Sequence, residues 1–252
     1  MSFYTSISEH YREIFPLNPA QPKFVIDHIP NVSNLSLLDI GCGTGDLCLA
    51  LSNSFRVVTG IDLDEEMLEI AQSAKGKAEN VDFHHLNMVE IGSFFAPKTY
   101  DAILCFGNTL VHLANLEEIT RFLGLAKSLL RPGGKLLMQI INYDRILNLN
   151  IKSLPTLDAD DIRFVRNYHY RNENQQDDRD RVDPHQIEFE TILTVKSTGQ
   201  VIRNQIPLFP IRKIALENRL LQAGFTNLHF YGNFKGDPFA EESIPMVLEV
   251  TA

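Results

Sequence analysis

The feature that most constrains the fold is a glycine-rich turn between an apolar strand and a helix. Residues 37–50 read Leu-Leu-Asp-Ile-Gly-Cys-Gly-Thr-Gly-Asp-Leu-Cys-Leu-Ala, with glycines at three alternate positions. Because glycine has no Cβ, the backbone at Gly41, Gly43 and Gly45 is free to adopt positive φ and to approach a bound molecule closely. The helix that follows points free N–H groups at the same place. The turn therefore predicts a cofactor site at the end of a strand.

Strand-like and helix-like segments alternate from residue 35 to 142, which is typical of βαβ units and a parallel sheet. The predicted strands in this part are 35–40, 55–61, 81–85, 101–106 and 135–142. A helix is predicted over 115–130, where Asn115 is a capping residue and Arg131-Pro132-Gly133-Gly134 ends the helix. Near the end of the chain we predict a helix at 211–223 and strands at 225–232 and 245–251.

The pattern changes after residue 144. Apolar and polar residues alternate along 186–195, and the segments 162–170 and 200–208 also read as extended. Alternation with a period of two predicts antiparallel strands, which form an insertion after the fifth strand of the sheet. The polar stretch Arg171–Asp183 is interpreted as a solvated connection within a hairpin.

Composition limits the classes of partner. The 252 residues carry a formal net charge of -9, which repels a phosphate backbone, so we expect a small-molecule ligand and no nucleic acid. Cys42, Cys48 and Cys105 suggest neither a disulfide framework nor a zinc site, and His84 and His85 point to opposite faces of a strand, so no metal is expected. With no leader and no apolar run of about 18 residues, we expect a cytoplasmic chain without a membrane segment. The oligomeric state stays open.

The spacing of the glycines bears on the choice of cofactor. A dinucleotide fingerprint needs Gly-x-Gly-x-x-Gly, and here Asp46 stands where the last of those glycines belongs. The second predicted strand nevertheless runs into Asp62, at the place where a carboxylate accepts the ribose hydroxyls of an adenosine ligand. Binding sites for nicotinamide cofactors and for adenosylmethionine both use a carboxylate at this place. The alternative for Asp62 and Asp64 is that they cap the next helix.

Three ordered motifs resemble those of a known family. The segment Leu-Leu-Asp-Ile-Gly-Cys-Gly-Thr-Gly resembles the first motif of class I S-adenosylmethionine-dependent methyltransferases. Tyr100-Asp101-Ala-Ile-Leu-Cys resembles their fourth-strand motif, and Leu129-Leu-Arg-Pro-Gly-Gly-Lys-Leu-Leu resembles the turn before their fifth strand. The resemblance covers about residues 35–142 and the two closing strands. It implies one α/β domain over residues 1–252, a Rossmann-like, mostly parallel seven-stranded sheet with helices on both faces, and S-adenosyl-L-methionine as cofactor.

A narrower resemblance lies within this one. Phe106-Gly-Asn-Thr-Leu-Val-His-Leu and Ile141-Asn-Tyr-Asp-Arg-Ile-Leu are similar to segments of the glycine N-methyltransferase family. This implies an N-terminal helical lid at 1–34 and an antiparallel substrate-lid subdomain at 145–210. Glycine-specific members carry a carboxylate-binding arginine where this chain has Ile141, and an apolar residue makes no such contact, so the acceptor stays open.

The resemblance implies methyl transfer to a small molecule, preferably an amine. A small hydroxylated acceptor of an O-methyltransferase is one alternative, and a cofactor-binding protein without turnover is another. A nicotinamide dehydrogenase would need the third glycine of the fingerprint, and Asp46 stands in its place.

The resemblance also assigns residues to the cofactor. The predicted cofactor-binding residues are Asp39, Gly41, Cys42, Gly43, Gly45, Asp62, Leu63, Met67, Asn87, Met88, Gly107 and Asn108. Asp39 and the glycine turn would hold the methionine end, and the central members of the set would hold adenosine. The last two lie beyond the fourth strand, where open α/β sheets bind ligands. The alternatives are a structural acid for Asp39, core packing for Met67 and a polar loop residue for Asn87.

Four residues are predicted to act on the acceptor. Asn142, Tyr143 and Asp144 follow the fifth strand and are expected to face the acceptor, and Asp144 or His112 is a candidate proton acceptor. The alternatives are helix capping by Asn142 and Asp144, and an ordinary hydrogen-bonding role for His112. Near the N-terminus, Tyr4 and Tyr11 either reach the cofactor or pack as amphipathic tyrosines.

Overall fold

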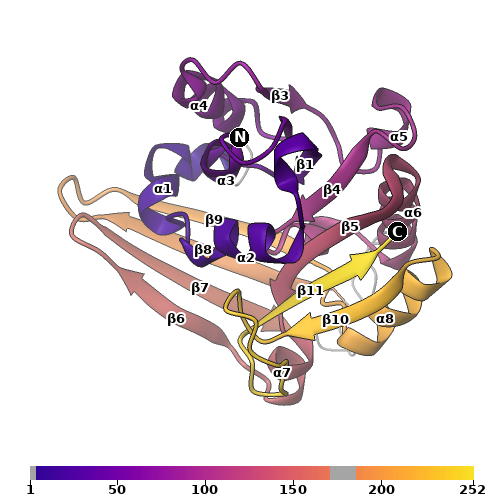
Figure 1. Ribbon diagram of the computed structural model, residues 1–252. Coiled ribbons are helices and arrows are strands. Elements are labelled where there is room, and N and C mark those ends of the chain that lie inside the picture. Colours follow the sequence, from indigo (N-terminus) through magenta and orange to yellow (C-terminus); the bar gives the residue numbers. More distant parts are fainter. Residues whose placement is uncertain (1–3, 171–185) are drawn as a thin grey trace.

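A computed structural model describes residues 4–170 and 186–252. The described chain forms two sheets (Figure 1). The larger sheet has the strand order β10-β11-β5-β4-β1-β2-β3, with bounds Thr226–Tyr231, Pro245–Thr251, Leu130–Ile141, Tyr100–Cys105, Ser36–Ile40, Val57–Asp62 and Val81–His85. All neighbours are parallel except that β11 runs antiparallel to both β5 and β10. The predicted seven-stranded, mostly parallel sheet is confirmed.

Helices cover both faces of the larger sheet. The helices packed on it are α2 (Ala20–His28), α3 (Asp46–Leu51), α4 (Glu65–Lys75), α5 (Ile91–Phe94), α6 (Leu116–Leu129) and α8 (Lys213–Gln222). Side chains alternate across a strand, so Leu37 packs in a core with α2 and α3, and Leu38 packs in a second core with α6 and α8. Each face of the sheet is therefore covered by a buried core, whereas the carboxyl-terminal edge of the parallel strands is not covered by these two cores.

The predicted ends of the elements hold to within a few residues. Helix α6 begins after Asn115, whose side chain accepts a hydrogen bond from Glu118 N at 2.9 Å, as predicted. Strand β5 begins at Leu130 rather than at 135, because Leu130 already pairs with Tyr100 before a shift of register. The predicted turn at 131–134 is thus an irregular start of this strand.

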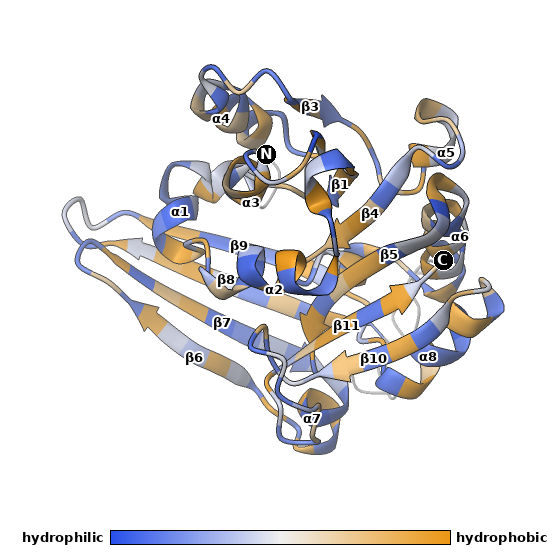
Figure 2. Cartoon of the chain, in the orientation of Figure 1, coloured by the Kyte–Doolittle hydropathy of each residue, from blue (hydrophilic) through white to orange (hydrophobic). Residues whose placement is uncertain are grey.

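The second sheet is antiparallel and follows α7 (Tyr143–Asn148). Its strand order is β6-β7-β8-β9, with bounds Ser153–Asp158, Ile162–Tyr170, Ile187–Val195 and Val201–Leu208. The last three were predicted as extended segments, whereas β6 was not predicted, because it is mostly exposed and contains Pro155. Hydrophilic and hydrophobic residues are mixed along these strands in Figure 2. The predicted connection at Arg171–Asp183 lies outside the described residues.

The N-terminal segment packs on this second sheet. It contains the 3-10 helix Thr5–His10 and α1 (Tyr11–Ile14), and α1 lies beside the second sheet in Figure 1. Ile7 and Ile14 form a small buried core with Phe164 and Leu193 of the sheet. The segment therefore bridges the inserted sheet and the rest of the fold.

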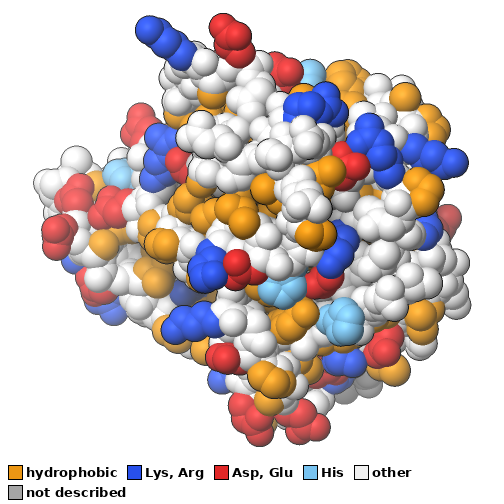
Figure 3. All heavy atoms as spheres, in the orientation of Figure 1, with side chains coloured by type: hydrophobic (Ala, Val, Ile, Leu, Met, Phe, Trp, Pro, Cys, Tyr) orange, Lys and Arg blue, Asp and Glu red, His pale blue; other side chains and the backbone are white. Residues whose placement is uncertain are grey.

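Charge and hydropathy complete the description. On the face shown in Figure 3, acidic and basic side chains are interspersed rather than gathered by sign. Within residues 4–170 and 186–252, every helix is too short or too polar to cross a membrane.

Candidate cofactor and acceptor site

The glycine turn is held tightly against its neighbours. Gly41 and Gly45 have φ of +72° and +75°, in the left-handed region that favours glycine. A Cβ at Gly41 would lie 2.6 Å from Thr109 Cγ2, and one at Gly45 would lie 2.6 Å from Phe83 Cζ. Only glycine fits at either position, so the turn lies close against Thr109 after β4 and against Phe83 of β3.

Asp62 ends β2 beside this turn. Its Oδ2 accepts a hydrogen bond from Gly43 N at 2.8 Å and its Oδ1 accepts one from Asp64 N at 3.0 Å. Asp64 is the residue that caps α4, by accepting a hydrogen bond from Met67 N at 3.2 Å. The capping alternative is therefore right for Asp64 and wrong for Asp62. Burial raises the pKa of the Asp62 carboxyl.

A cavity of about 300 Å³ opens at the carboxyl-terminal edge of the larger sheet. It brings together many of the predicted residues: Gly41, Gly43, Asp62, Leu63, Met67, Met88, Gly107 and His112. Met67 is buried and also lines the cavity, so it has both of the roles that were considered for it. The cavity also has Tyr4 and Tyr11 in its wall, with Ile206 contributed by β9 of the second sheet.

A second cavity of about 420 Å³ adjoins the first, because Tyr4, Tyr11, Gly41 and Gly107 line both. Other residues of its wall come from the N-terminal segment (Asn18 and Gln21), from the end of β1 and the glycine turn (Asp39 and Cys42), and from the second sheet (Leu157 and Arg166). The two cavities therefore adjoin each other between the glycine turn, the N-terminal segment and the second sheet.

Asp39 is a buried acid at the end of β1. Its Oδ2 accepts a hydrogen bond from Cys48 Sγ at 3.3 Å. Burial raises the pKa of the Asp39 carboxyl to about 7, and the neighbouring Asp62 acts in the same direction. A positive charge brought near this carboxyl would favour its ionised form. Asp39 thus has the chemistry that a ligand ammonium needs.

Tyr4 and His112 form a hydrogen-bonded pair in the cavity wall. Tyr4 Oη lies 2.9 Å from His112 Nε2. Burial lowers the pKa of the His112 imidazole to about 4, so the ring is neutral at neutral pH. Burial also raises the pKa of the Tyr4 phenol. Neither group carries a charge near pH 7, and a base with so low a pKa has little driving force to take a proton.

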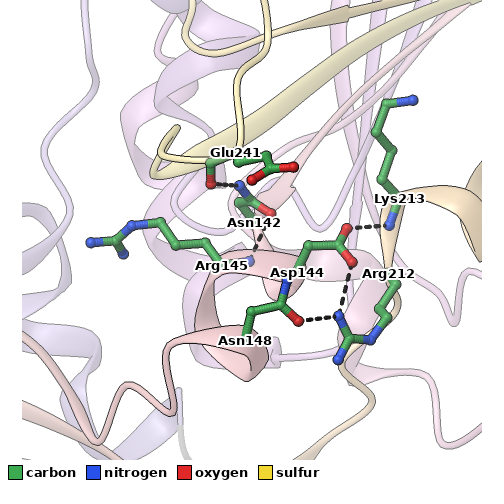
Figure 4. Close-up of polar contacts among 7 residues, drawn as sticks. All are labelled: Asn142, Asp144, Arg145, Asn148, Arg212, Lys213 and Glu241. Carbon is green, nitrogen blue, oxygen red and sulfur yellow. Dashed lines mark hydrogen bonds and ion pairs between the residues drawn. The ribbon is translucent and has the colours of Figure 1, made fainter.

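Asn142 and Asp144 are committed elsewhere, which corrects the expectation that they face the acceptor (Figure 4). Asn142 Oδ1 accepts from Arg145 N at 3.2 Å, and its Nδ2 donates to the carbonyls of Glu241 and Ser243, both at 3.0 Å. Neither Asn142 nor Asp144 belongs to the walls described above. The capping alternative holds for Asn142, because its side chain caps α7.

Asp144 joins α7 to the start of α8. Its carboxylate accepts hydrogen bonds from Arg212 Nη1 at 3.1 Å and from Lys213 N at 2.8 Å. Figure 4 shows Arg212 reaching Asn148 of α7 as well. The acid therefore holds two helices together, and its oxygens already have partners.

Four further predicted residues lie outside the walls of both cavities: Asn108, Tyr143, Asn87 and Gly45. Asn108 donates from Nδ2 to Tyr143 Oη at 3.0 Å, and its Oδ1 accepts from Ile141 N at 2.9 Å, so it ties the ends of β4 and β5 together. Asn87 Oδ1 accepts from Val89 N at 3.1 Å, which matches the loop alternative. Gly45 packs under the turn as described above.

Sequence reasoning missed several wall residues. Thr109 lies within a segment that the sequence had marked, and its hydroxyl donates to the Phe106 carbonyl at 2.7 Å. Ile206 and Arg166 come from the second sheet, and no local pattern indicates that they reach the cavities. In residues 4–170 and 186–252, no group of three His, Cys, Asp or Glu side chains is placed to hold a metal ion.

Comparisons with known proteins agree with this geometry. A family model described as a methyltransferase domain matches residues 37–134. The ubiquinone biosynthesis O-methyltransferase of Saccharophagus degradans is 30% identical over 133 residues, which cover 52% of this chain and 54% of that protein. The glycine/sarcosine N-methyltransferase of Aphanothece halophytica is 25% identical over 217 residues, which cover 86% and 76%. The chain spans about half the length of the first curated relatives that it matches.

A solved structure shares the whole fold. The structure of an S-adenosylmethionine-dependent methyltransferase from Clostridium acetobutylicum superposes with a TM-score of 0.80 at 13% identity, covering 99% of both chains. The strand order, the antiparallel pair at one edge and the glycine turn after β1 define the class I methyltransferase fold. Residues 37–134 match a methyltransferase domain, and the described fold is the one that class I S-adenosylmethionine-dependent methyltransferases share.

Proposed function

We propose that this chain transfers a methyl group from S-adenosylmethionine to a small-molecule amine. The observation that carries the proposal is the pair of adjoining cavities at the edge of the larger sheet, of which one is lined by Asp62 and the other by Asp39. The Asp62 carboxylate is suited to accept the two ribose hydroxyls, and Met67 and Met88 supply an apolar wall for adenine. Asp39 and the glycine turn are suited to the ammonium and carboxylate of the methionine end.

The reaction asks mainly for positioning. When bound, the cofactor supplies a methyl group already activated by its sulfonium. The chain has to hold the acceptor nitrogen in line with that methyl group and exclude water, and such positioning is worth up to about 7–11 kcal/mol. Tyr4, Tyr11 and His112 form an uncharged wall beside Gly107, where this contact would occur. A desolvated wall lowers the pKa of an amine and so favours its neutral, nucleophilic form.

The extent of the matches favours nitrogen over oxygen as the accepting atom. The match to the glycine/sarcosine N-methyltransferase spans 217 residues and so reaches into the inserted sheet, whereas the match to the O-methyltransferase spans 133. The inserted sheet contributes Ile206 and Arg166 to the two cavities. We therefore assign the described strands β6–β9 of the inserted sheet and the N-terminal segment to covering the acceptor, as the predicted lids.

Calorimetry with S-adenosylmethionine and with NAD tests the cofactor. We expect binding of S-adenosylmethionine and no binding of NAD; the reverse result would overturn the proposal. A screen with S-adenosylmethionine labelled on the methyl group, using amines, hydroxy acids and thiols as acceptors, then tests the reaction. Transfer to hydroxyl compounds alone would replace the amine by the O-methyl alternative. Cofactor binding without transfer to any acceptor would favour a protein that binds without turnover.

A further inference from the structure

Two buried polar atoms lack hydrogen-bond partners in the described part of the chain, and they lie side by side. They are Nε of Arg166 and Oγ1 of Thr191. Arg166 on β7 and Thr191 on β8 are direct partners in the antiparallel register. Directly opposite residues point to the same face of a sheet, with Cβ atoms about 4.5–5.5 Å apart. The second sheet thus holds two unsatisfied donor groups at a single position.

These groups belong to a polar row on an otherwise apolar face. Thr191 pairs in turn with Asn204 on β9, so Arg166, Thr191 and Asn204 form one line across three strands. The next residues on the same face, Phe164 and Leu193, pack against the N-terminal segment. Arg166 itself lines the second cavity. The row therefore lies on the face that is turned toward the site.

The charge of Arg166 has no counter-charge among the described residues. Its Nη2 donates to the Pro155 carbonyl at 2.7 Å, and its Cζ lies 6.0 Å from the centre of the Phe164 ring. Asp46, an acid in the same cavity, is already paired with Arg12 at 3.0 Å. Burial lowers the pKa of the Arg166 guanidinium, which is the sign of a cation that has lost water without gaining an anion. A partly buried cation of this kind is costly unless something pairs with it.

We propose that Arg166 binds a carboxylate of the methyl acceptor, so that the acceptors are small amines that also carry a carboxylate. This rests on the proposed methyl transfer. A guanidinium is planar and donates two parallel hydrogen bonds to a carboxylate, which fits a small anionic ligand better than a neutral one. The Thr191 hydroxyl stands beside it as a further donor. Ile141 at the end of β5 is apolar and cannot pair with a carboxylate, whereas Arg166 supplies a cation from the second sheet.

Arg166 reaches the second cavity from another element than the groups assigned to the cofactor, although Asp39 lines the same cavity. The groups assigned to the cofactor come from the edge of the larger sheet, whereas Arg166 comes from β7. Arg166 lines the second cavity together with Phe106 and Gly107, which directly follow β4. Arg166 is therefore next to the part of the site beyond β4, where the acceptor amine would meet the methyl group.

The test uses acetate and its neutral counterpart acetamide as probes. Both are titrated, with detection by ligand-observed NMR, into the whole chain saturated with S-adenosylhomocysteine. We expect acetate to bind at least tenfold more tightly than acetamide. Arg166→Gln should abolish this preference and leave the affinity for S-adenosylmethionine within twofold. Thr191→Val should weaken acetate about threefold. The matched control is Arg163→Gln, because Arg163 lies on the same strand, is exposed and points to the opposite face.

Stability provides an independent readout that also reports folding. Removing an unpaired, partly buried charge should stabilise the free protein, so Arg166→Met is expected to raise Tm, and acetate is expected to raise Tm only in proteins that keep Arg166. A lower Tm for Arg166→Met would contradict the unpaired charge. If that variant does not fold, Arg166→Lys, which retains the charge but loses the planar fork, should bind acetate more weakly than the wild type.

Several outcomes would overturn the proposal. Equal binding of acetate and acetamide would exclude an anion subsite, as would unchanged acetate binding by Arg166→Gln. A tenfold loss of S-adenosylmethionine affinity in Arg166→Gln, with acetate unaffected, would assign the guanidinium to the cofactor carboxylate instead. Failure of the wild type to bind S-adenosylmethionine would refute the proposed function separately, because the preference for acetate over acetamide is also measurable without the nucleoside.

Discussion

The edge of the larger sheet and the polar row of the second sheet handle their polar groups in opposite ways. At the edge, both Asp62 oxygens already accept backbone hydrogen bonds, and the glycine turn is packed against Thr109. In the second sheet, Arg166 Nε and Thr191 Oγ1 are buried without a partner. The proposed cofactor part of the site is thus preorganised by the protein itself, whereas the proposed acceptor part contains polar groups that still lack partners.

The largest expected effect comes from filling the turn. Gly41→Ala should lower the unfolding free energy by about 2–5 kcal/mol, because the left-handed backbone costs an alanine about 1–2 kcal/mol and overpacking adds about 1–3 kcal/mol. Movement of the turn away from Thr109 should also weaken S-adenosylmethionine binding by about 1–3 kcal/mol, the overpacking part of this cost. The added methyl group would lie 2.6 Å from Thr109 Cγ2. Calorimetry of the variant measures the loss. An affinity within threefold of the wild type would show that the turn is not preorganised.

Gly133→Ala is the matched control for this variant. Gly133 has φ of +78°, and nothing lies within 4 Å of an added Cβ. The backbone penalty is the same, but the clash and the site are absent. We expect a lower Tm and an unchanged affinity for S-adenosylmethionine.

The next effect concerns the ribose contact. Asp62→Asn should weaken S-adenosylmethionine binding by about 1.5–3 kcal/mol, the usual value for a lost hydrogen bond to a charged group. Asp82→Asn is the control, because Asp82 is an exposed acid on the neighbouring strand β3 and pairs only with Lys75 among the described residues. Unchanged binding by Asp62→Asn would remove Asp62 from the site and with it the assignment of the adenosine end.

Asp39 makes the stability of the free protein depend on pH. The pKa of its carboxyl is about 7 in the folded chain and 3.8 in the reference state, so the folded chain binds the additional proton between these values. Its contribution to stability is complete below pH 3.8 and is lost as pH rises through 7, with a slope of up to about 1.4 kcal/mol per pH unit. The difference in unfolding free energy between the wild type and Asp39→Asn, measured from pH 5 to 8, isolates this slope.

The two regions also differ in how well sequence alone predicts them. The turn at 41–45 and Asp62 are local: a few consecutive residues define the backbone and its chemistry, and the structure brings them into one cavity. Asn142 and Asp144 were placed correctly at the end of β5, but their partners, Glu241, Ser243 and Lys213, lie far along the chain. Sequence gave no signal for these partners.

Arg166 is the extreme case of this difference. The extended pattern of 162–170 predicted the strand, yet the proposed role of Arg166 depends on its register with Thr191 and on the N-terminal segment packed over the same face. Such relations arise only when distant segments meet. Local patterns therefore predict the cofactor edge, and tertiary packing determines what the second sheet adds to it.

A smaller effect is expected at the hydrogen-bonded pair in the wall. Tyr4→Phe and His112→Gln should each lower kcat/KM by about 0.5–1.5 kcal/mol, the net value of one hydrogen bond. Because both act through the contact between Tyr4 Oη and His112 Nε2, the double variant should lose little more than either single one. With a pKa of about 4, His112 should also produce no step in the rate between pH 6 and 8. Additive losses in the double variant would contradict this shared role. A step in the rate between pH 6 and 8 that His112→Gln abolishes would show that His112 acts as a base.

The smallest effect on activity is expected at Asp144, where the sequence alone predicted a role with the acceptor. Its carboxylate holds Arg212 and Lys213 at the start of α8, so Asp144→Asn should lower the unfolding free energy by about 1 kcal/mol, a modest value because the side chain is partly exposed. Values of kcat and KM should stay within twofold, because both carboxylate oxygens are engaged away from the two cavities. Denaturant unfolding and methyl-transfer kinetics of the same preparation measure both quantities. A large fall in kcat at unchanged stability would move Asp144 back into the reacting part of the site, and the acceptor region would then extend beyond the polar row to the start of α7.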